Sequence, residues 1–116
     1  MKINLNADIG EGYGKWKMGD DESLLKVINS ANIACGKHAG DENIMRNIIS
    51  FCIKQNVSIG AHPGFSDIEG FGRRRINLSS KEVENLIAYQ TGSLIGISHL
   101  EGGEVSHIKP HGALNN

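Results

Sequence analysis

Apolar residues along the chain follow two different spacings, one typical of β-strands and the other typical of α-helices. Strand-like segments, with alternating apolar residues or short β-branched runs, occupy residues 2–6, 31–35, 57–61 and 105–109. Helix-like segments, in which apolar residues recur every three or four positions, lie between them at residues 20–29, 41–55 and 79–100. The predicted order is therefore strand, helix, strand, helix, strand, helix, strand.

Polar residues suited to capping precede each predicted helix. Asp20 or Asp21 precedes the first helix and Asp41 the second, while Ser79 and Glu82 form a capping box at the start of the third. The regular alternation of strands and helices predicts βαβ units with right-handed crossovers and a parallel sheet, within one domain over residues 1–116. Periodicity alone does not distinguish an open doubly wound sheet from a closed barrel.

Composition narrows the class of protein and its expected location. The 116 residues carry a formal net charge of −1, so nothing suggests nucleic acid or an anionic membrane as a partner. The N-terminus lacks the apolar region of a signal peptide, and no apolar stretch reaches the roughly 18 residues that span a bilayer. We therefore expect a cytoplasmic protein. Cys35 and Cys52 lack C-x-x-C spacing and are interpreted as reduced, buried thiols.

Chemically useful side chains recur where the predicted strands end. Two carboxylates follow the first strand, one histidine follows each of the next two strands, and a lysine and a histidine close the fourth: Asp8, Glu11, His38, His62, Lys109 and His111. The carboxyl ends of parallel strands share one face in α/β proteins, and that face holds the active site. We therefore expect these side chains to meet. His99, late in a helix, and His107, inside a strand, receive no role.

Two kinds of chemistry fit this set of residues. Asp8, His38 and His62 provide the two imidazoles and one carboxylate of a divalent metal site that activates water. Alternatively, a carboxylate and a histidine act as general base and general acid without a metal. The sequence contains no H-E-x-x-H motif that would favour the first alternative. The glycines at residues 10–14 and the pair Gly36-Lys37 lack the spacing of phosphate-binding loops.

Several ordered motifs resemble the LamB/YcsF family, whose members are assigned as the A subunits of bacterial ATP-dependent 5-oxoprolinases. The matching segments extend along the whole chain, at residues 4–11, 31–36, 38–41, 60–63, 70–73, 89–90 and 109–114. Lys37 stands where the family usually has an aromatic residue, and Asn115 where it usually has tyrosine. Family members are considerably longer, and this chain matches only their first half.

The resemblance implies both a fold and an activity. The fold is a (β/α) barrel of the glycoside hydrolase/deacetylase type, expected here as about four βα units of a partial barrel. The activity is hydrolysis of 5-oxoproline (pyroglutamate) to L-glutamate, coupled to ATP hydrolysis, in company with subunits B and C. The residues inside the motifs that we expect to be catalytic are Asp8, Glu11, His62, Lys109 and His111.

Two alternatives remain open from the sequence. One is a metal-dependent, deacetylase-like hydrolase, which rests on the analogy between folds. The other is an inactive, truncated remnant that retains a binding surface for partner subunits, because half a barrel leaves sheet edges and apolar helix faces exposed.

Overall fold

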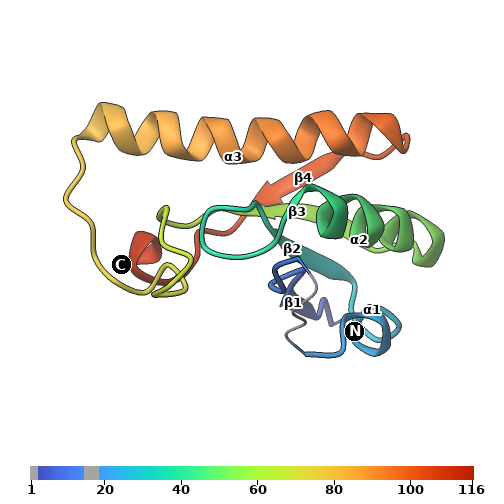
Figure 1. The fold of residues 1–116 in the computed structure, drawn as a ribbon. Helices are drawn as coiled ribbons and strands as arrows, with labels where there is room; N and C mark the ends of the chain where they lie inside the picture. Colours follow the sequence, from blue (N-terminus) through green and yellow to red (C-terminus); the bar gives the residue numbers. More distant parts are fainter. Residues whose placement is uncertain (1–2, 15–18) are drawn as a thin grey trace.

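The structure is a computed structural model that describes residues 3–14 and 19–116. Within these residues one sheet contains four parallel strands, which are β1 (Asn6–Ile9), β2 (Ser30–Ala34), β3 (Ser58–His62) and β4 (Val105–Ile108). The helices that connect them are α1 (Asp21–Leu25), α2 (Glu42–Gln55) and α3 (Ser80–Leu100), and a short 3₁₀ helix, η1 (Gly112–Asn115), follows β4 (Figure 1).

The strand order identifies the kind of parallel sheet. Each strand pairs with the strand that precedes it in the sequence, in the order β1-β2-β3-β4. A doubly wound sheet reverses direction at a switch point, whereas a (β/α) barrel adds each new strand to the same side. The order therefore confirms the predicted partial barrel, with β1 and β4 at the two edges of the described sheet.

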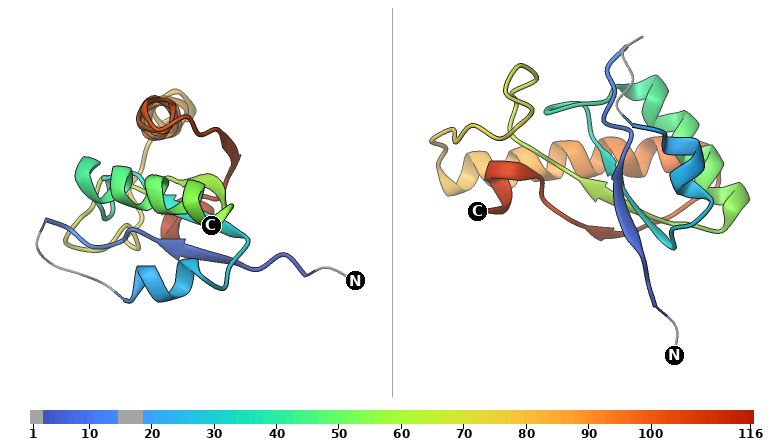
Figure 2. Two further views of the ribbon diagram at one scale, coloured as in Figure 1. Left: turned by 90° about the vertical axis from the view of Figure 1, so that its right-hand side faces the viewer. Right: turned by 90° about the horizontal axis from the view of Figure 1, so that it is seen from below.

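The apolar core lies on the face of the sheet that the helices cover. Outward-facing residues of the first three strands, such as Ile9, Ile33 and Ile59, are buried. They pack in one cluster with residues from all three helices: Leu25, Met45, Ile48, Ile49, Cys52 and Leu94. Figure 2 shows α2 and α3 stacked above the strands. This cluster is the main source of stability, because burial of apolar surface dominates the free energy of folding.

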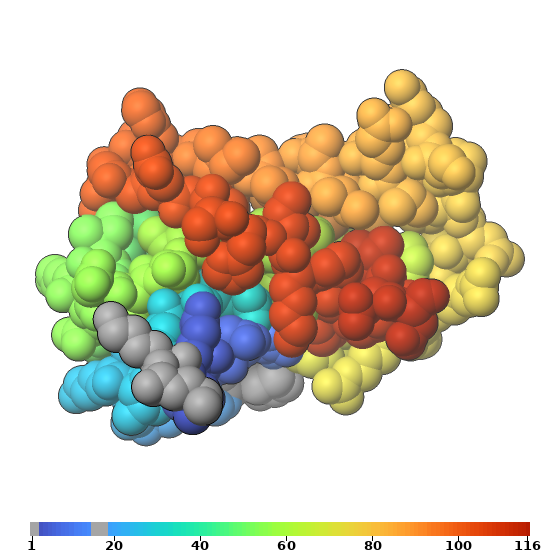
Figure 3. Space-filling model, turned by 180° about the vertical axis from the view of Figure 1, so that it is seen from behind, coloured from blue at the N-terminus to red at the C-terminus, as the bar shows by residue number. Residues whose placement is uncertain are grey.

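The opposite, concave face of the sheet is polar. Polar residues of the four strands and of the segments beside β1 and β4 line a cavity of about 410 Å³ on this side: Asn4, Asn6, Ser30, Asn32, Ser58, Ser106, His107 and Lys109. Figure 3 shows β1 and β4 at the surface when the molecule is viewed from behind. Because successive side chains of a strand point to opposite faces, the same strands supply both the core and a polar surface.

Two predicted elements differ from those observed. The first strand is predicted at residues 2–6, of which residue 2 lies outside the described part. In the structure β1 begins at Asn6. Ile3 and Leu5, which precede it, are 72% and 52% exposed. The first helix ends at Leu25 instead of Asn29. Asn29 accepts a hydrogen bond from the Leu5 amide through Oδ1 and donates its own amide to the Leu5 carbonyl. These bonds draw Asn29 alongside the start of β1, so the helix cannot extend to it.

The other elements agree with the predictions within one or two residues. Asp41 caps α2 by accepting from the amides of Asn43 and Ile44, and the capping box of Ser79 and Glu82 is present at α3. Cys35 and Cys52 are buried free thiols, as expected. In the described part of the chain, no helix is long and apolar enough to cross a membrane.

Candidate active site

The six predicted site residues meet at the carboxyl end of the sheet. Asp8 lies within β1 instead of after it, and His62 is the last residue of β3. The other four follow β1, β2 or β4 in loops, namely Glu11, His38, Lys109 and His111. Because all four strands are parallel, their ends deliver these side chains to one edge.

Four of these side chains form a compact group, Glu11, His38, His62 and His111, and one ligand atom of each lies within 4.8 Å of those of the others. Glu11 Oε2 is 2.7 Å from His38 Nε2 and 3.6 Å from His111 Nδ1. His111 Nδ1 is also 3.0 Å from His62 Nε2. The rings of His38 and His111 are stacked with their centroids 3.7 Å apart. All three histidines are buried, so this group is enclosed by protein.

The hydrogen bonds of two rings determine where their protons lie. His62 Nδ1 donates to the carbonyl of Lys109, and His111 Nε2 donates to the carbonyl of Phe71, because a carbonyl oxygen can only accept. A neutral imidazole has one N–H, so the remaining nitrogens, His62 Nε2 and His111 Nδ1, are both lone-pair acceptors that face each other. Two such lone pairs are compatible at 3.0 Å only when they share a proton or a metal cation.

Burial affects how readily the proton between these two rings is lost as the pH rises. Desolvation lowers the pKa of the His62 imidazole, against the opposing effect of the Asp8 carboxylate. Desolvation and the neighbouring His38 lower the pKa of His111. The shared proton is therefore lost more readily than from an exposed histidine, which leaves the lone pairs available to a metal.

Asp8 belongs to a second, adjacent arrangement. Its Oδ1 accepts from Lys109 Nζ at 2.9 Å and from the Asn32 side-chain amide at 3.2 Å, and its Oδ2 lies 3.5 Å from His62 Nε2. Burial alone would raise the pKa of the Asp8 carboxyl, but Lys109, His62 and Asn32 outweigh it and hold the pKa below its ordinary value. Asp8 is therefore ionised at neutral pH.

The geometry suggests a different metal set from the one expected at Asp8, His38 and His62. The compact group includes Glu11 in place of Asp8, and it adds His111 as a third imidazole. Three imidazole nitrogens and one carboxylate oxygen are a donor set that divalent transition metals such as zinc prefer. The metal assignment stays a prediction, now centred on Glu11, His38, His62 and His111.

Sequence reasoning missed two polar residues that contact this site from the sheet. Asn32, only 1% exposed, bonds Asp8, and His107 Nε2 lies 2.9 Å from Asn32 Oδ1. One signal was available, because Asn32 is the only strongly polar residue in the otherwise apolar segment 31–35. A side-chain amide in a buried strand requires partners, and these lie on neighbouring strands.

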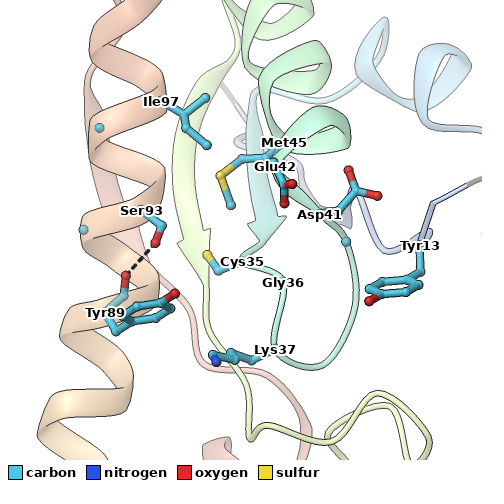
Figure 4. A pocket seen from close by; sticks show the side chains of 13 residues that line it. Tyr13, Cys35, Gly36, Lys37, Asp41, Glu42, Met45, Tyr89, Ser93 and Ile97 are labelled. Atoms are coloured by element: carbon cyan, nitrogen blue, oxygen red, sulfur yellow. Dashed lines mark hydrogen bonds between the residues drawn. The ribbon is translucent and has the colours of Figure 1, made fainter.

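A separate cavity of about 510 Å³ lies between α2 and α3 and contains none of the four grouped residues. Figure 4 shows Cys35, Met45 and Ile97 at its apolar side, with Lys37 and Tyr89 near its rim. The Lys37 ammonium lies 4.9 Å from the centroid of the Tyr89 ring. Burial raises the pKa of the Cys35 thiol to about 11, so this cysteine is a protonated thiol and not a nucleophile at neutral pH. The candidate acid–base chemistry therefore lies at the strand ends.

Fold and site together define a class of protein. A sequentially ordered parallel sheet with imidazoles and carboxylates at its carboxyl end is part of a TIM-barrel-like protein. The sequence profile of the LamB/YcsF family matches residues 3–116. The chain belongs to the LamB/YcsF family.

Similar proteins agree with this assignment. The 5-oxoprolinase A subunit of Azoarcus sp. (strain BH72) is 56% identical over 116 residues, which is all of this chain and 45% of that protein. The 5-oxoprolinase A subunit of Pyrococcus furiosus is 50% identical, over all of this chain and 46% of that protein. The crystal structure of a lactam utilization protein from Thermus thermophilus superposes with a TM-score of 0.94 at 43% identity, over 97% of this chain and 46% of that one. The chain thus spans a little under half the length of these relatives.

Proposed function

We propose that this chain carries the catalytic residues of a 5-oxoprolinase, which opens the lactam ring of 5-oxoproline to give L-glutamate and couples this step to ATP hydrolysis. The observation that carries the proposal is the convergence of two imidazole lone pairs, a third imidazole and two carboxylates at one edge of the sheet. The relatives are named as A subunits of 5-oxoprolinase, which supplies the substrate and implies further subunits, taken here to be B and C.

ATP makes the hydrolysis feasible because a lactam amide is stabilised by resonance and resists water. Transfer of the terminal phosphoryl group of ATP to the lactam oxygen releases ADP and leaves an electrophilic carbon. Water adds to this carbon, and the ring C–N bond then breaks to give an acyl phosphate and a free amine. A second water molecule releases inorganic phosphate and leaves the carboxylate of L-glutamate.

The residues of the chain have matching roles. Asp8, ionised and held by Lys109, accepts the proton of the attacking water. The ammonium of Lys109 stabilises the negative charge that develops on oxygen. The proton that Asp8 takes from water passes to the His62 and His111 pair, because Asp8 Oδ2 lies 3.5 Å from His62 Nε2, and the pair delivers it to the departing ring nitrogen. Glu11 holds the His38 ring against this pair.

A divalent metal also fits this site, because the donor atoms of the four side chains converge. In addition, backbone carbonyls accept from His62 Nδ1 and His111 Nε2, which leaves the other nitrogen of each ring free to bind an ion. Glu11, His38, His62 and His111 would hold the ion. Bound there, it would supply Lewis acidity for polarising an amide oxygen. This observation also favours a second candidate function, a metal-dependent deacetylase-like hydrolase that needs no ATP.

One experiment tests the proposal and separates the two candidates. The protein is combined with its partner subunits, and ADP, phosphate and L-glutamate are measured with and without 5-oxoproline and with and without a chelator. We expect release that depends on 5-oxoproline, and we expect Asp8→Asn and His62→Gln to lower it about 100-fold or more. His99→Gln, on the exposed end of α3, is the matched control and retains activity.

Two results would contradict this proposal. One is full turnover in Asp8→Asn and His62→Gln. The other is amide hydrolysis of an acetylated sugar that needs no ATP and is lost on chelation, which would support the deacetylase-like alternative.

A further inference from the structure

A chain of hydrogen bonds crosses the concave face of the sheet and ends on Asp8. It starts at Ser106, whose Oγ lies 2.9 Å from His107 Nδ1. It continues from His107 Nε2 to Asn32 Oδ1 at 2.9 Å, and from Asn32 Nδ2 to Asp8 Oδ1 at 3.2 Å. The chain therefore links β4, β2 and β1.

The chemistry of the groups fixes the direction of each bond. The Asp8 carboxylate only accepts, so the Asn32 amide nitrogen must face it and the Asn32 oxygen must face His107. Asn32 Oδ1 in turn requires a hydrogen on His107 Nε2. The Ser106 hydroxyl lies within hydrogen-bond distance of both the Ile59 carbonyl and His107 Nδ1. Whichever of these two groups the hydroxyl hydrogen points to, His107 Nε2 keeps its hydrogen.

A glycine on the intervening strand makes this contact possible. His107 on β4 reaches Asn32 on β2 by lying across Gly60 of β3, which pairs with both residues. A Cβ atom at Gly60 would overlap the imidazole ring of His107. Glycine weakens a strand, so its presence here is explained by the close approach of the ring.

We propose that Asn32 and His107 are positioning residues for Asp8: His107 fixes the orientation of the Asn32 amide, and this amide holds the carboxylate of the general base. Without the His107 donor, the Asn32 amide is held only through its nitrogen, by Asn6 and Asp8, and its oxygen side loses its partner. The amide then moves more freely and holds the carboxylate less firmly in the position it occupies beside Lys109 and His62. This inference rests on the proposed function, because it takes Asp8 as the base.

The chain offers a discriminating set of variants. His107→Gln replaces Nε2 by an amide nitrogen at a similar distance along the side chain, so it keeps the donor. His107→Leu fills the same space without a donor. Gly60→Ala leaves His107 in the sequence but displaces its ring. Gly92→Ala is the matched control for a glycine substitution, because a Cβ atom there meets no described residue beyond its own part of α3 within 4 Å.

The first measurement is hydrogen exchange of the Asn32 side-chain amide in ¹⁵N-labelled protein, with the signal assigned by its loss in Asn32→Asp. We expect exchange to accelerate about fivefold in His107→Leu and Gly60→Ala, since each loses a hydrogen bond worth ~1 kcal/mol. We expect His107→Gln and Gly92→Ala to match the unsubstituted protein.

The second measurement is turnover of 5-oxoproline by the complex with its partner subunits. We expect His107→Leu to lower kcat with little change in KM, and His107→Gln to restore it. Unchanged amide exchange in His107→Leu would overturn the positioning role. An equal loss of kcat in His107→Leu and His107→Gln would also overturn it. Altered exchange in a complex that shows no 5-oxoproline turnover would instead refute the proposed function and leave the hydrogen-bond chain in place.

Discussion

Gly64→Ala is the substitution for which the structure predicts the most specific damage to the histidine group. A Cβ atom at Gly64 would lie 2.6 Å from Nδ1 and 3.0 Å from Cβ of His38. The backbone of Gly64 cannot move aside, because its amide and carbonyl are both bonded to the side chain of Gln90, which is fully buried. The clash must therefore displace His38.

His38 has little room for this displacement. One face of its ring is stacked on His111 at 3.7 Å between centroids, and Phe71 meets it edge-on at 5.3 Å. Overpacking a buried site of this kind costs about 1–3 kcal/mol of unfolding free energy. A displacement near 1 Å would also break the 2.7 Å contact with Glu11 and lower turnover about 100-fold.

The assay is urea denaturation of the purified protein, together with NMR of the labelled His38 ring and turnover in the complex. Gly92→Ala is the control, because within the described residues the new methyl group meets no atom beyond its own part of α3 within 4 Å. Since glycine is a poor helix former, this control should gain about 0.5–1 kcal/mol. Equal unfolding free energies for the two variants, or an unshifted His38 signal in Gly64→Ala, would refute the reasoning.

Three further predictions concern buried polar groups and pH. Gln90→Leu should lower the unfolding free energy by about 2–4 kcal/mol in urea denaturation, because it leaves the amide and carbonyl of Gly64 buried without partners; a change below the cost of one hydrogen bond would contradict this. Arg74 lowers the pKa of Asp67 to about 2, so their pairing stabilises the fold above pH 3.8 and is lost as the pH falls toward 2. Asp67→Asn should therefore flatten the dependence of Tm on pH across that window. Co²⁺ affinity, followed by absorption spectroscopy, should be nearly constant above pH 6.5, because burial lowers the pKa of His62 and His111, and should fall at lower pH as these rings gain protons. An affinity that keeps rising above pH 6.5 would contradict this.

Much of the fold could be predicted because its local signals agree with one another. The N-cap at Asp41 and the capping box at Ser79 mark two helices whose apolar faces have the expected spacing. The start of β1 could not be predicted in this way. Ile3 and Leu5 alternate as well as any strand residues, and only the bonds between Leu5 and the distant Asn29 determine where pairing begins.

The members of the site were predictable, but their grouping was not. The rule that strand ends share a face correctly placed Glu11, His38, His62 and His111 together. Which carboxylate joins the histidines depends on side-chain direction, which this rule does not contain. Asp8 lies within β1 and accepts from Lys109 and Asn32, whereas Glu11 lies in the loop beyond β1 and contacts His38.

The site consequently has two parts that are supported in different ways. Asp8 is held by residues on the sheet, where hydrogen bonds between strands limit movement. Glu11, His38 and His111 lie in loops, and their positions depend on close packing and on backbone carbonyls such as that of Phe71. His62, the last residue of β3, contacts both parts, with Nε2 lying 3.5 Å from Asp8 and 3.0 Å from His111. If Asp8 is the general base, as proposed, its place on the sheet keeps its position fixed, while the imidazole group in the loops can adjust to a substrate.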